Sequence, residues 1–356
     1  MKINILLPGI QRKISGGVKV VFEYANELAK NNNEVNIYFD CSNSLKSIKF
    51  INFIRKIICK ISIYIYPRWF VFEKGIKKKC VFSVTDETID NANFIFATAI
   101  QTASPVKYLS EKKGKKLYLI QGFENWTGYT DDEIYDTYNL GMKNIVVSKW
   151  LKNIVDKHSR EKSILIKNGI DCSIFKINKP IEKRNKYNIA MLYHTAEYKG
   201  CKYGIKVLSE LKKEYPDLDV TLFGVYKKPK NLPKWIKYIY NPSKNKLVEI
   251  YNNAAIYVCP TLNDGFGLTG AESMACGCAF ISTDYGGQKE YSIENENVLL
   301  SLPKDIEAMK KNLELVIEND LLRIKLAENG NEYVRKNLNK ENSINLLKQI
   351  IYNDKK

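Results

Sequence analysis

The chain has 356 residues, of which 45% are hydrophobic and 27% are charged, a composition typical of a globular protein long enough for two domains. This excludes a small disulfide scaffold, a long disordered chain, a collagen-like repeat and a coiled coil. The 56 Lys and Arg residues outnumber the 39 Asp and Glu residues, and the net charge of +17 favours nucleotides, nucleic acid or an anionic membrane as partners.

Patterns for metal binding and for export are weak. The chain has two histidines, His158 and His194, and eight cysteines without a Cys-x-x-Cys pair, so we expect neither a zinc site nor an iron–sulfur cluster. Cys276 and Cys278 lie in an apolar stretch and are expected to be buried, reduced thiols. No apolar run has the length of a signal peptide or of a membrane-spanning helix, so we expect a cytoplasmic location.

The first half of the chain has the pattern of a parallel α/β sheet. Residues 2–7 predict a strand, a loop then ends in Gly16 and Gly17, and the apolar spacing that follows is helical. This order is typical of a doubly wound fold. Further strands are expected at residues 34–39, 93–97, 116–120 and 144–147, and a helix is expected after Ser148 as its N-cap.

Residues 46–79 combine basic and bulky apolar side chains. This stretch has ten basic residues and one acidic residue, Glu73, with apolar residues such as Phe53 and Trp69 between them. Such a pattern at helical spacing is typical of a segment in an anionic membrane interface, and a packed helix with a solvated basic face is the alternative. We expect this segment to contact the inner face of the cell membrane.

The α/β pattern begins again after a polar stretch at residues 176–186, where we expect a linker. The predicted strands are 187–193, 220–224, 255–259 and 279–283, and the predicted helices are 201–214, 243–253 and 269–275. From residue 304 onward the pattern is helical, with a break near 337–339. The sequence therefore predicts an α/β protein with two Rossmann-like doubly wound domains that face each other across a cleft.

The most informative segment is a glycine-rich loop between a strand and a helix. It consists of Asp264, Gly265, Phe266, Gly267, Leu268, Thr269, Gly270, Ala271 and Glu272. Its glycines allow backbone N–H groups to approach an anion at a helix N-terminus, and its two carboxylates can accept hydrogen bonds from sugar hydroxyls. The alternative is structural, because Thr269 and Glu272 have the spacing of a capping box.

This segment resembles the GT-B glycosyltransferases of family 4, a large group of retaining enzymes, and the resemblance extends over most of the chain. In that family the first acid of the segment binds donor-sugar hydroxyls and the second binds the nucleotide ribose. The resemblance implies these roles for Asp264 and Glu272, although the family has Glu at the first position. Further segments resemble the family pattern in the same order along the chain: Ser15–Gly17, Val147–Trp150, Asn168–Asp171 with Phe175, and Ser282–Gly287 with Glu290.

The resemblance also implies how the donor diphosphate is bound. Gly16 and Gly17 match the glycine turn beside the diphosphate, and Lys199 matches a family lysine that precedes a glycine. The family arginine five residues earlier is His194 here, and Lys202 is a possible substitute cation. No metal is expected, and we interpret Asp217-Leu218-Asp219 as a polar turn.

The acceptor side is expected in the first domain. A family histidine near the reacting sugar is replaced by Gln121, which cannot act as a base near neutrality, and Glu124 and Trp126 are expected to line the acceptor side. We therefore expect a front-face displacement, in which the leaving diphosphate assists the incoming hydroxyl and the protein positions the substrates and stabilises negative charge. On this interpretation Asp264, Lys199 and Gln121 contribute to catalysis.

The resulting hypothesis is a metal-independent retaining glycosyltransferase. It would move a hexose or deoxyhexose from a UDP-, GDP- or dTDP-sugar to a glycan or lipid-linked glycan of a cell-surface polysaccharide. The alternatives are an epimerase or hydrolase of the same fold and a non-enzymatic binder of polyanions, although we expect no nucleic-acid partner. The expected domains are an acceptor-side domain at 1–177, a nucleotide-sugar-binding domain at 187–336 and a C-terminal helix at 337–356 that returns to the first domain.

Overall fold

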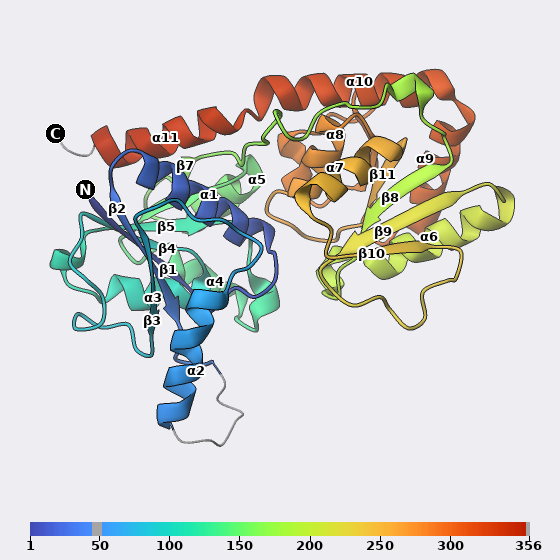
Figure 1. Cartoon of the computed structure of the whole chain (residues 1–356). Coiled ribbons are helices and arrows are strands. Elements are labelled where there is room, and N and C mark those ends of the chain that lie inside the picture. Colours follow the sequence, from blue (N-terminus) through green and yellow to red (C-terminus); the bar gives the residue numbers. More distant parts are fainter. Residues whose placement is uncertain (45–51, 354–356) are drawn as a thin grey trace. The chain divides into compact units, whose positions relative to one another are not determined.

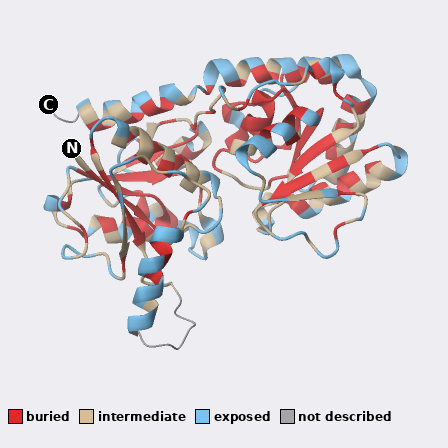
Figure 2. Cartoon of the chain, viewed as in Figure 1, coloured by how far each residue is buried: buried red, intermediate tan, exposed pale blue. Residues whose placement is uncertain are grey.

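The computed structural model describes residues 1–44 and 52–353. The chain divides into two compact units. The first unit comprises Met1–Ile166 together with Ile344–Lys356, and the second comprises Lys167–Ser343. Each unit contains a parallel sheet with helices packed around it (Figure 1), and its buried residues gather on the sheet and on the helix faces that cover it (Figure 2).

The sheet of the first unit is built around β1. Over residues 1–44 and 52–166 it has seven strands in the order β3-β2-β1-β4-β5-β6-β7, and the pairs are parallel. The strands are β1 (Lys2–Leu7), β2 (Glu34–Asp40), β3 (Ile76–Val81), β4 (Phe94–Ala97), β5 (Lys115–Ile120), β6 (Lys143–Val146) and β7 (Ile164–Leu165). The helices are α1 (Gly16–Lys30), α2 (Asn52–Ile65), α3 (Ile100–Lys107), α4 (Asp131–Thr137) and α5 (Lys149–His158).

The second unit repeats this topology around β8. Within residues 167–343 the sheet has six parallel strands in the order β10-β9-β8-β11-β12-β13. The strands are β8 (Asn188–Leu192), β9 (Asp219–Gly224), β10 (Lys237–Tyr240), β11 (Ile256–Cys259), β12 (Ala279–Thr283) and β13 (Val298–Ser301). The helices are α6 (Cys201–Glu214), α7 (Lys244–Asn253), α8 (Leu268–Ala275), α9 (Ile306–Glu318) and α10 (Asp320–Asn337).

The predicted fold class is confirmed, because both units are Rossmann-like α/β domains with parallel sheets. The bounds predicted for β1, α6 and β12 are those observed, and Ser148 caps α5 by accepting a hydrogen bond from the Leu151 N–H at 3.2 Å. Four strands were not predicted from the sequence: β3, β7, β10 and β13. None of the four is longer than six residues.

The C-terminal part of the chain is helical, as predicted. Helix α10 ends at Asn337 and α11 (Lys340–Asn353) begins three residues later. From Ile344 onward α11 belongs to the first unit, where the Asn33 side chain donates a hydrogen bond of 2.7 Å to the Tyr352 hydroxyl. Residues 354–356 of the predicted C-terminal helix lie outside the described residues.

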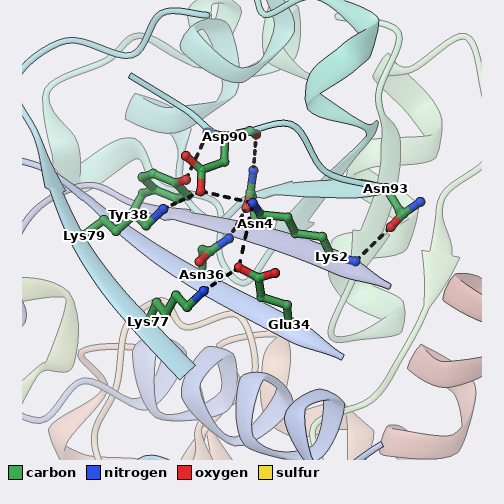
Figure 3. A network of polar contacts seen from close by, with 9 residues as sticks. All are labelled: Lys2, Asn4, Glu34, Asn36, Tyr38, Lys77, Lys79, Asp90 and Asn93. Carbon is green, nitrogen blue, oxygen red and sulfur yellow. Dashed lines mark hydrogen bonds and ion pairs between the residues drawn. The ribbon is translucent and has the colours of Figure 1, made fainter. Parts of the chain in front are cut away.

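The basic stretch has two different structures. Residues 46–51 lie outside the described part, and helix α2 covers only Asn52–Ile65, so the helical prediction is wrong beyond Ile65. The last lysines of the basic stretch lie on β3 or just before it, and two of them have acidic partners. Lys77 lies 2.8 Å from Glu34, and Lys79 pairs with Asp90 (Figure 3). The pKa of the Asp90 carboxyl is lowered to about 2, mainly by its hydrogen bond from Lys79.

No helix in the described ranges is both long enough and apolar enough to span a bilayer.

Candidate active site

The candidate site lies at the carboxyl edge of the second sheet. Strands β8 and β11 are neighbours there, and the chain leaves them in opposite directions, since β8 pairs next with β9 and β11 with β12. Ligands of doubly wound folds bind at such a switch point, outside the carboxyl ends of the strands. The loop after β8 contains Lys199, and the loop after β11 contains Asp264.

Backbone contacts hold these two loops together. The Tyr198 carbonyl accepts hydrogen bonds from the N–H groups of Leu262 and Asn263, at 2.7 and 3.3 Å. Gly200 has a φ of +62°, and a Cβ atom at this position would lie 1.8 Å from the Pro260 carbonyl oxygen. Only glycine allows the backbone to pass so closely, so the approach of the two loops depends on this residue.

Lys199 and Asp264 form an ion pair across the switch point, and their side chains are 17% and 22% exposed. Burial alone would lower the pKa of Lys199. The attraction and the hydrogen bond of Asp264 exceed that effect, so the pKa of Lys199 is raised and the ammonium group stays charged. The structure thus brings together the cation predicted for the diphosphate and the carboxylate predicted for the sugar.

The glycine-rich loop starts helix α8 in an unusual way. Gly267 is the N-cap residue and has a φ of +82°, and a Cβ atom there would lie 1.9 Å from the Tyr285 hydroxyl. The Tyr291 hydroxyl donates a hydrogen bond of 2.7 Å to the Gly267 carbonyl. The capping-box alternative is therefore wrong, because Thr269 is the second residue of α8 and not its N-cap. Gly265 and Phe266 are buried, whereas Leu268 is partly exposed.

Glu272 lies in the second turn of α8 and is only 4% exposed. Glu272 lies near the buried Tyr257. Burial is the main cause that raises the pKa of Tyr257 well above its ordinary value, and the nearby Glu272 raises it further. The predicted ribose-binding carboxylate is thus a buried acid, unlike the partly exposed pair of Lys199 and Asp264.

The other two predicted cations differ from Lys199. The His194 ring nitrogen Nδ1 accepts a hydrogen bond of 2.9 Å from the Ala196 N–H, so this nitrogen carries no proton, and the neutral imidazole has its proton on Nε2. The ring lies edge-to-face against Tyr226, with centroids 4.7 Å apart. Lys202 is exposed and lies 2.6 Å from Glu197, which offsets its charge.

The carboxyl edge of the first sheet holds the glycine turn predicted for the diphosphate and the glutamine predicted to lie near the reacting sugar. Gly16 and Gly17 are the first two residues of α1. The Gln121 side-chain Nε2 donates a hydrogen bond of 2.9 Å to the Gly17 carbonyl. The loop after β5 is thereby joined to the start of α1, so two residues predicted from separate motifs lie together in this unit.

Glu124 and Trp126 follow Gln121 in the same loop. A Glu124 carboxylate oxygen accepts a hydrogen bond of 2.6 Å from the Ile100 N–H at the start of α3. Burial raises the pKa of Glu124 to about 7, although this hydrogen bond acts in the opposite direction. The Trp126 ring lies against Gly122, where a Cβ atom would be 2.7 Å from the ring, and the side chain is 40% exposed.

Three residues that support the site, Gly200, Tyr285 and Gly287, lie in segments that match the family pattern, whereas Tyr291 was not predicted. Gly200 and Gly287 allow close backbone contacts, since a Cβ atom on Gly287 would lie 2.4 Å from the Asp264 carbonyl oxygen. Tyr285 and Tyr291 fix the Gly267 turn. Tyr291 directly follows Glu290, the last residue of those segments, and it belongs to no motif of its own. Across 1–44 and 52–353, no group of three or more His, Cys, Asp or Glu side chains could hold a metal ion.

Comparison with known proteins places both loops in one recognised segment. Residues 173–333 match the family Glycosyl transferases group 1. The group 1 segment includes Lys199, Asp264 and Glu272, and it covers most of the second unit. The second unit is therefore similar to the group 1 glycosyltransferases.

An uncharacterized glycosyltransferase of Methanocaldococcus jannaschii is 29% identical over 202 residues, which are 54% of this chain and 55% of that protein. A Campylobacter jejuni enzyme named N,N'-diacetylbacillosaminyl-diphospho-undecaprenol alpha-1,3-N-acetylgalactosaminyltransferase is 29% identical over 91 residues, 26% of this chain and 24% of that enzyme. The chain spans about half the length of the first curated relatives it matches.

The fold itself is shared over nearly the whole chain. The Anabaena protein HepE, solved in complex with UDP and glucose, matches with a TM-score of 0.74 over 99% of both chains, at 13% sequence identity. The two-domain fold is therefore that of the GT-B glycosyltransferases.

Proposed function

We propose that the protein is a retaining, metal-independent glycosyltransferase that transfers a hexose or deoxyhexose from a nucleotide-diphosphate sugar. The observation that supports this most directly is the ion pair between Lys199 and Asp264 at the switch point between β8 and β11, within the group 1 segment. A carboxylate and an ammonium group side by side match a donor that has sugar hydroxyls next to a diphosphate.

The proposed roles follow from the chemistry of each side chain. Asp264 accepts hydrogen bonds from the hydroxyls of the donor sugar, and Glu272 accepts them from the ribose. Lys199 binds the diphosphate, together with the N–H groups at the glycine-rich start of α8. His194 and Lys202 of the second unit complete the proposed diphosphate contacts there.

The proposed reaction needs no protein base. The leaving diphosphate takes the proton of the incoming hydroxyl on the same face of the sugar, while Lys199 stabilises the negative charge that develops on that diphosphate. Gln121 positions the sugar by hydrogen bonding, since an amide has no titratable proton near neutrality.

The proposed acceptor is a glycan or lipid-linked glycan of a cell-surface polysaccharide, bound beside Glu124 and Trp126. Trp126 is exposed enough to stack against a sugar ring. The name of the Campylobacter relative, with a diphospho-undecaprenol acceptor, supports a lipid-linked acceptor. We accordingly propose a cytoplasmic enzyme that is peripheral on the inner face of the cell membrane.

Release of nucleotide from UDP-, GDP- and dTDP-sugars tests this function. We expect the wild-type protein to hydrolyse or transfer one class of donor. Asp264→Asn should lower the turnover at least about a hundredfold, the loss typical of one positioned group that acts in the transition state. Glu272→Gln should mainly weaken donor binding, because the ribose contact is the same before and during the reaction.

An exposed residue of the same unit provides the control. Glu182→Gln changes a carboxylate outside the site and should leave turnover unchanged. If no donor of the three classes is turned over, or if Asp264→Asn is as active as Glu182→Gln, the proposed function is wrong.

A further inference from the structure

Helix α2 contacts the rest of the first unit through one arginine and a few buried side chains. The Arg55 guanidinium donates hydrogen bonds to the carbonyls of Cys41 and Ser42, at 3.2 and 2.8 Å. Cys59, Ser62 and Ile63 are the other buried side chains of the helix, with exposures of 1%, 7% and 4%. The remainder of α2 extends away from the sheet of its unit (Figure 1).

The opposite face of α2 is apolar and exposed, and Figure 2 shows it in pale blue. Its apolar side chains are 40% to 81% exposed: Phe53, Ile54, Ile57, Ile58, Ile61, Tyr64 and Ile65. So many large apolar side chains on one surface helix indicate a surface that is covered when the protein functions. Lys56 and Lys60 lie exposed on the same helix, which favours an anionic lipid surface as the covering partner.

Two guanidinium groups lie at the end of this helix. Arg12 and Arg68 lie against the ring of Tyr66, with their Cζ atoms 5.4 and 5.5 Å from its centroid. Both arginines are exposed, and neither forms an ion pair with a carboxylate in the part of the chain that the structure describes. Tyr66 follows directly after Ile65, the last residue of α2.

The segment that contains Arg68 is joined to the loop that contains Arg12. The Trp69 indole N–H donates a hydrogen bond of 3.3 Å to the Gln11 carbonyl, and this bond attaches the segment after α2 to the loop after β1. Arg12 precedes Gly16 by four residues, a distance of at most about 14 Å. Because Gly17 accepts the hydrogen bond from Gln121, the arginine pair and the proposed acceptor site lie near one another in the first unit.

We propose that Arg12 and Arg68 bind the phosphate groups of a lipid-linked acceptor, while the exposed face of α2 lies in the membrane that holds this lipid. A guanidinium group binds phosphate oxygens through two parallel N–H donors, and both groups here also contact the Tyr66 ring. An apolar face beside guanidinium groups that have no carboxylate partner among residues 1–44 and 52–353 is complementary to a lipid phosphate, whereas a soluble phosphate would need only the charges. This inference rests on the proposed function, because it assigns the acceptor class of the same enzyme.

Vesicle co-sedimentation with the full chain tests the proposal. Three kinds of vesicle would be used: phosphatidylcholine alone, phosphatidylcholine with phosphatidylglycerol, and phosphatidylcholine with a polyprenyl phosphate. The two anionic kinds would carry the same surface charge. The wild-type protein should bind the polyprenyl phosphate vesicles at least about tenfold more tightly than the phosphatidylglycerol vesicles. The double variant Arg12→Gln/Arg68→Gln should lose about thirtyfold on the polyprenyl phosphate vesicles, from about 1 kcal/mol for each basic residue at an anionic surface.

Matched controls separate this site from general charge. Lys112→Gln/Arg160→Gln removes the same charge from exposed positions of the same unit and should change binding less than about twofold. Ile57→Ser/Ile61→Ser removes exposed apolar area from α2 and should weaken binding to all three vesicles. Circular dichroism of each variant confirms that it is folded.

Two results would overturn the proposal. One is equal binding of the wild-type protein to both anionic vesicles, which would show attraction to bulk lipid charge alone. The other is an arginine variant that binds polyprenyl phosphate vesicles as its charge-matched control does. Vesicle binding requires no donor, so an arginine-dependent preference without turnover of any sugar nucleotide would contradict the proposed function and leave the lipid-phosphate site in place.

Discussion

Lys199 and Asp264 neutralise each other, and this has a consequence for donor binding. A diphosphate that approaches Lys199 meets the Asp264 carboxylate at the same time, so the like charges repel and compete for one ammonium group. A sugar nucleotide offsets this repulsion because its hydroxyls donate hydrogen bonds to the carboxylate. A nucleoside diphosphate without the sugar has no such group.

The single variants Asp264→Asn and Lys199→Met should therefore change the affinity for a nucleoside diphosphate in opposite directions. We expect Asp264→Asn to bind it about three- to tenfold more tightly than the wild-type protein, because Lys199 is then available and the repulsion is removed. Lys199→Met should bind it at least about tenfold more weakly. Isothermal titration with UDP, GDP and dTDP measures both, and equal weakening by the two variants would contradict the proposed geometry.

Glu124 makes the stability of the first unit depend on pH. Its pKa is raised from 4.5 in the unfolded chain to about 7 in the folded protein, chiefly by burial, so the folded state retains a proton that the unfolded state loses. The stability that this proton provides is fully present below about pH 4.5 and is lost as the pH rises through about 7.

The variant Glu124→Gln cannot ionise at this position, so its stability relative to the wild-type protein should increase as the pH rises. We expect the difference in free energy of unfolding to change by roughly 3 kcal/mol between pH 4.5 and pH 8, as measured by urea unfolding. Exposed Glu111→Gln is the control and should show a flat difference. A flat profile for Glu124→Gln would mean that its carboxyl group is solvated.

At the scale of elements, residues 176–186 show that a polar stretch can be an anchored part of a domain. This stretch was predicted as a linker, yet it lies within the second compact unit. Arg184, only 4% exposed, donates hydrogen bonds to the carbonyls of Tyr251 and Ala254 at the end of α7 and of Cys276 and Gly277 after α8. Two helix C-termini thus surround one cation, and their dipoles favour it.

Replacement of Arg184 should detach residues 176–186 from the rest of the second unit. Arg184→Met leaves several buried carbonyls without a donor, and we expect a loss of roughly 3 to 5 kcal/mol in the free energy of unfolding. Limited proteolysis should then cleave within 176–186. Exposed Lys183→Met is the matched control and should resist cleavage as the wild-type protein does, and equal resistance of both variants would contradict the anchoring role of Arg184.

The elements that were predicted and those that were missed differ in how much of their signal is local. Helix α6 has buried apolar residues at helical spacing and strand β12 is buried along its whole length, and their bounds followed from these local patterns. Strand β3 has three consecutive lysines, and it is stabilised by partners that only the fold supplies, such as Glu34 for Lys77 and Asp90 for Lys79. The periodicity of an edge strand with such side chains gives no signal in the sequence.

The same distinction applies to the candidate site. Asp264 and Lys199 could be identified from a glycine-rich loop and a Lys-Gly pair together with the family resemblance. Their contact could not, because it depends on how the Gly200 backbone passes Pro260, 60 positions further along the chain. The neutral state of His194 also depends on a local hydrogen bond from Ala196 that no motif contains.

At the scale of the whole molecule, the residues of the proposed function are distributed over two units whose sheets have the same topology. The second unit contains Lys199, Asp264 and Glu272, which are proposed for the donor. The first contains Glu124 and Trp126, which are proposed for the acceptor, and Gln121, which is proposed to position the sugar. The net charge of +17 attracts nucleotides and anionic membranes alike, and particular side chains supply the selectivity. Among these we assign Lys199 to the donor diphosphate and Arg12 and Arg68 to a lipid phosphate.

Hydrogen exchange of the wild-type protein with and without a sugar nucleotide tests the central claim most directly. The account predicts that a donor at a concentration that saturates turnover slows the exchange of backbone amides at residues 196–201 and 264–268 at least about fivefold. Unchanged exchange in both segments, with slower exchange elsewhere in the chain, would contradict the assignment of the donor site to the loops after β8 and β11.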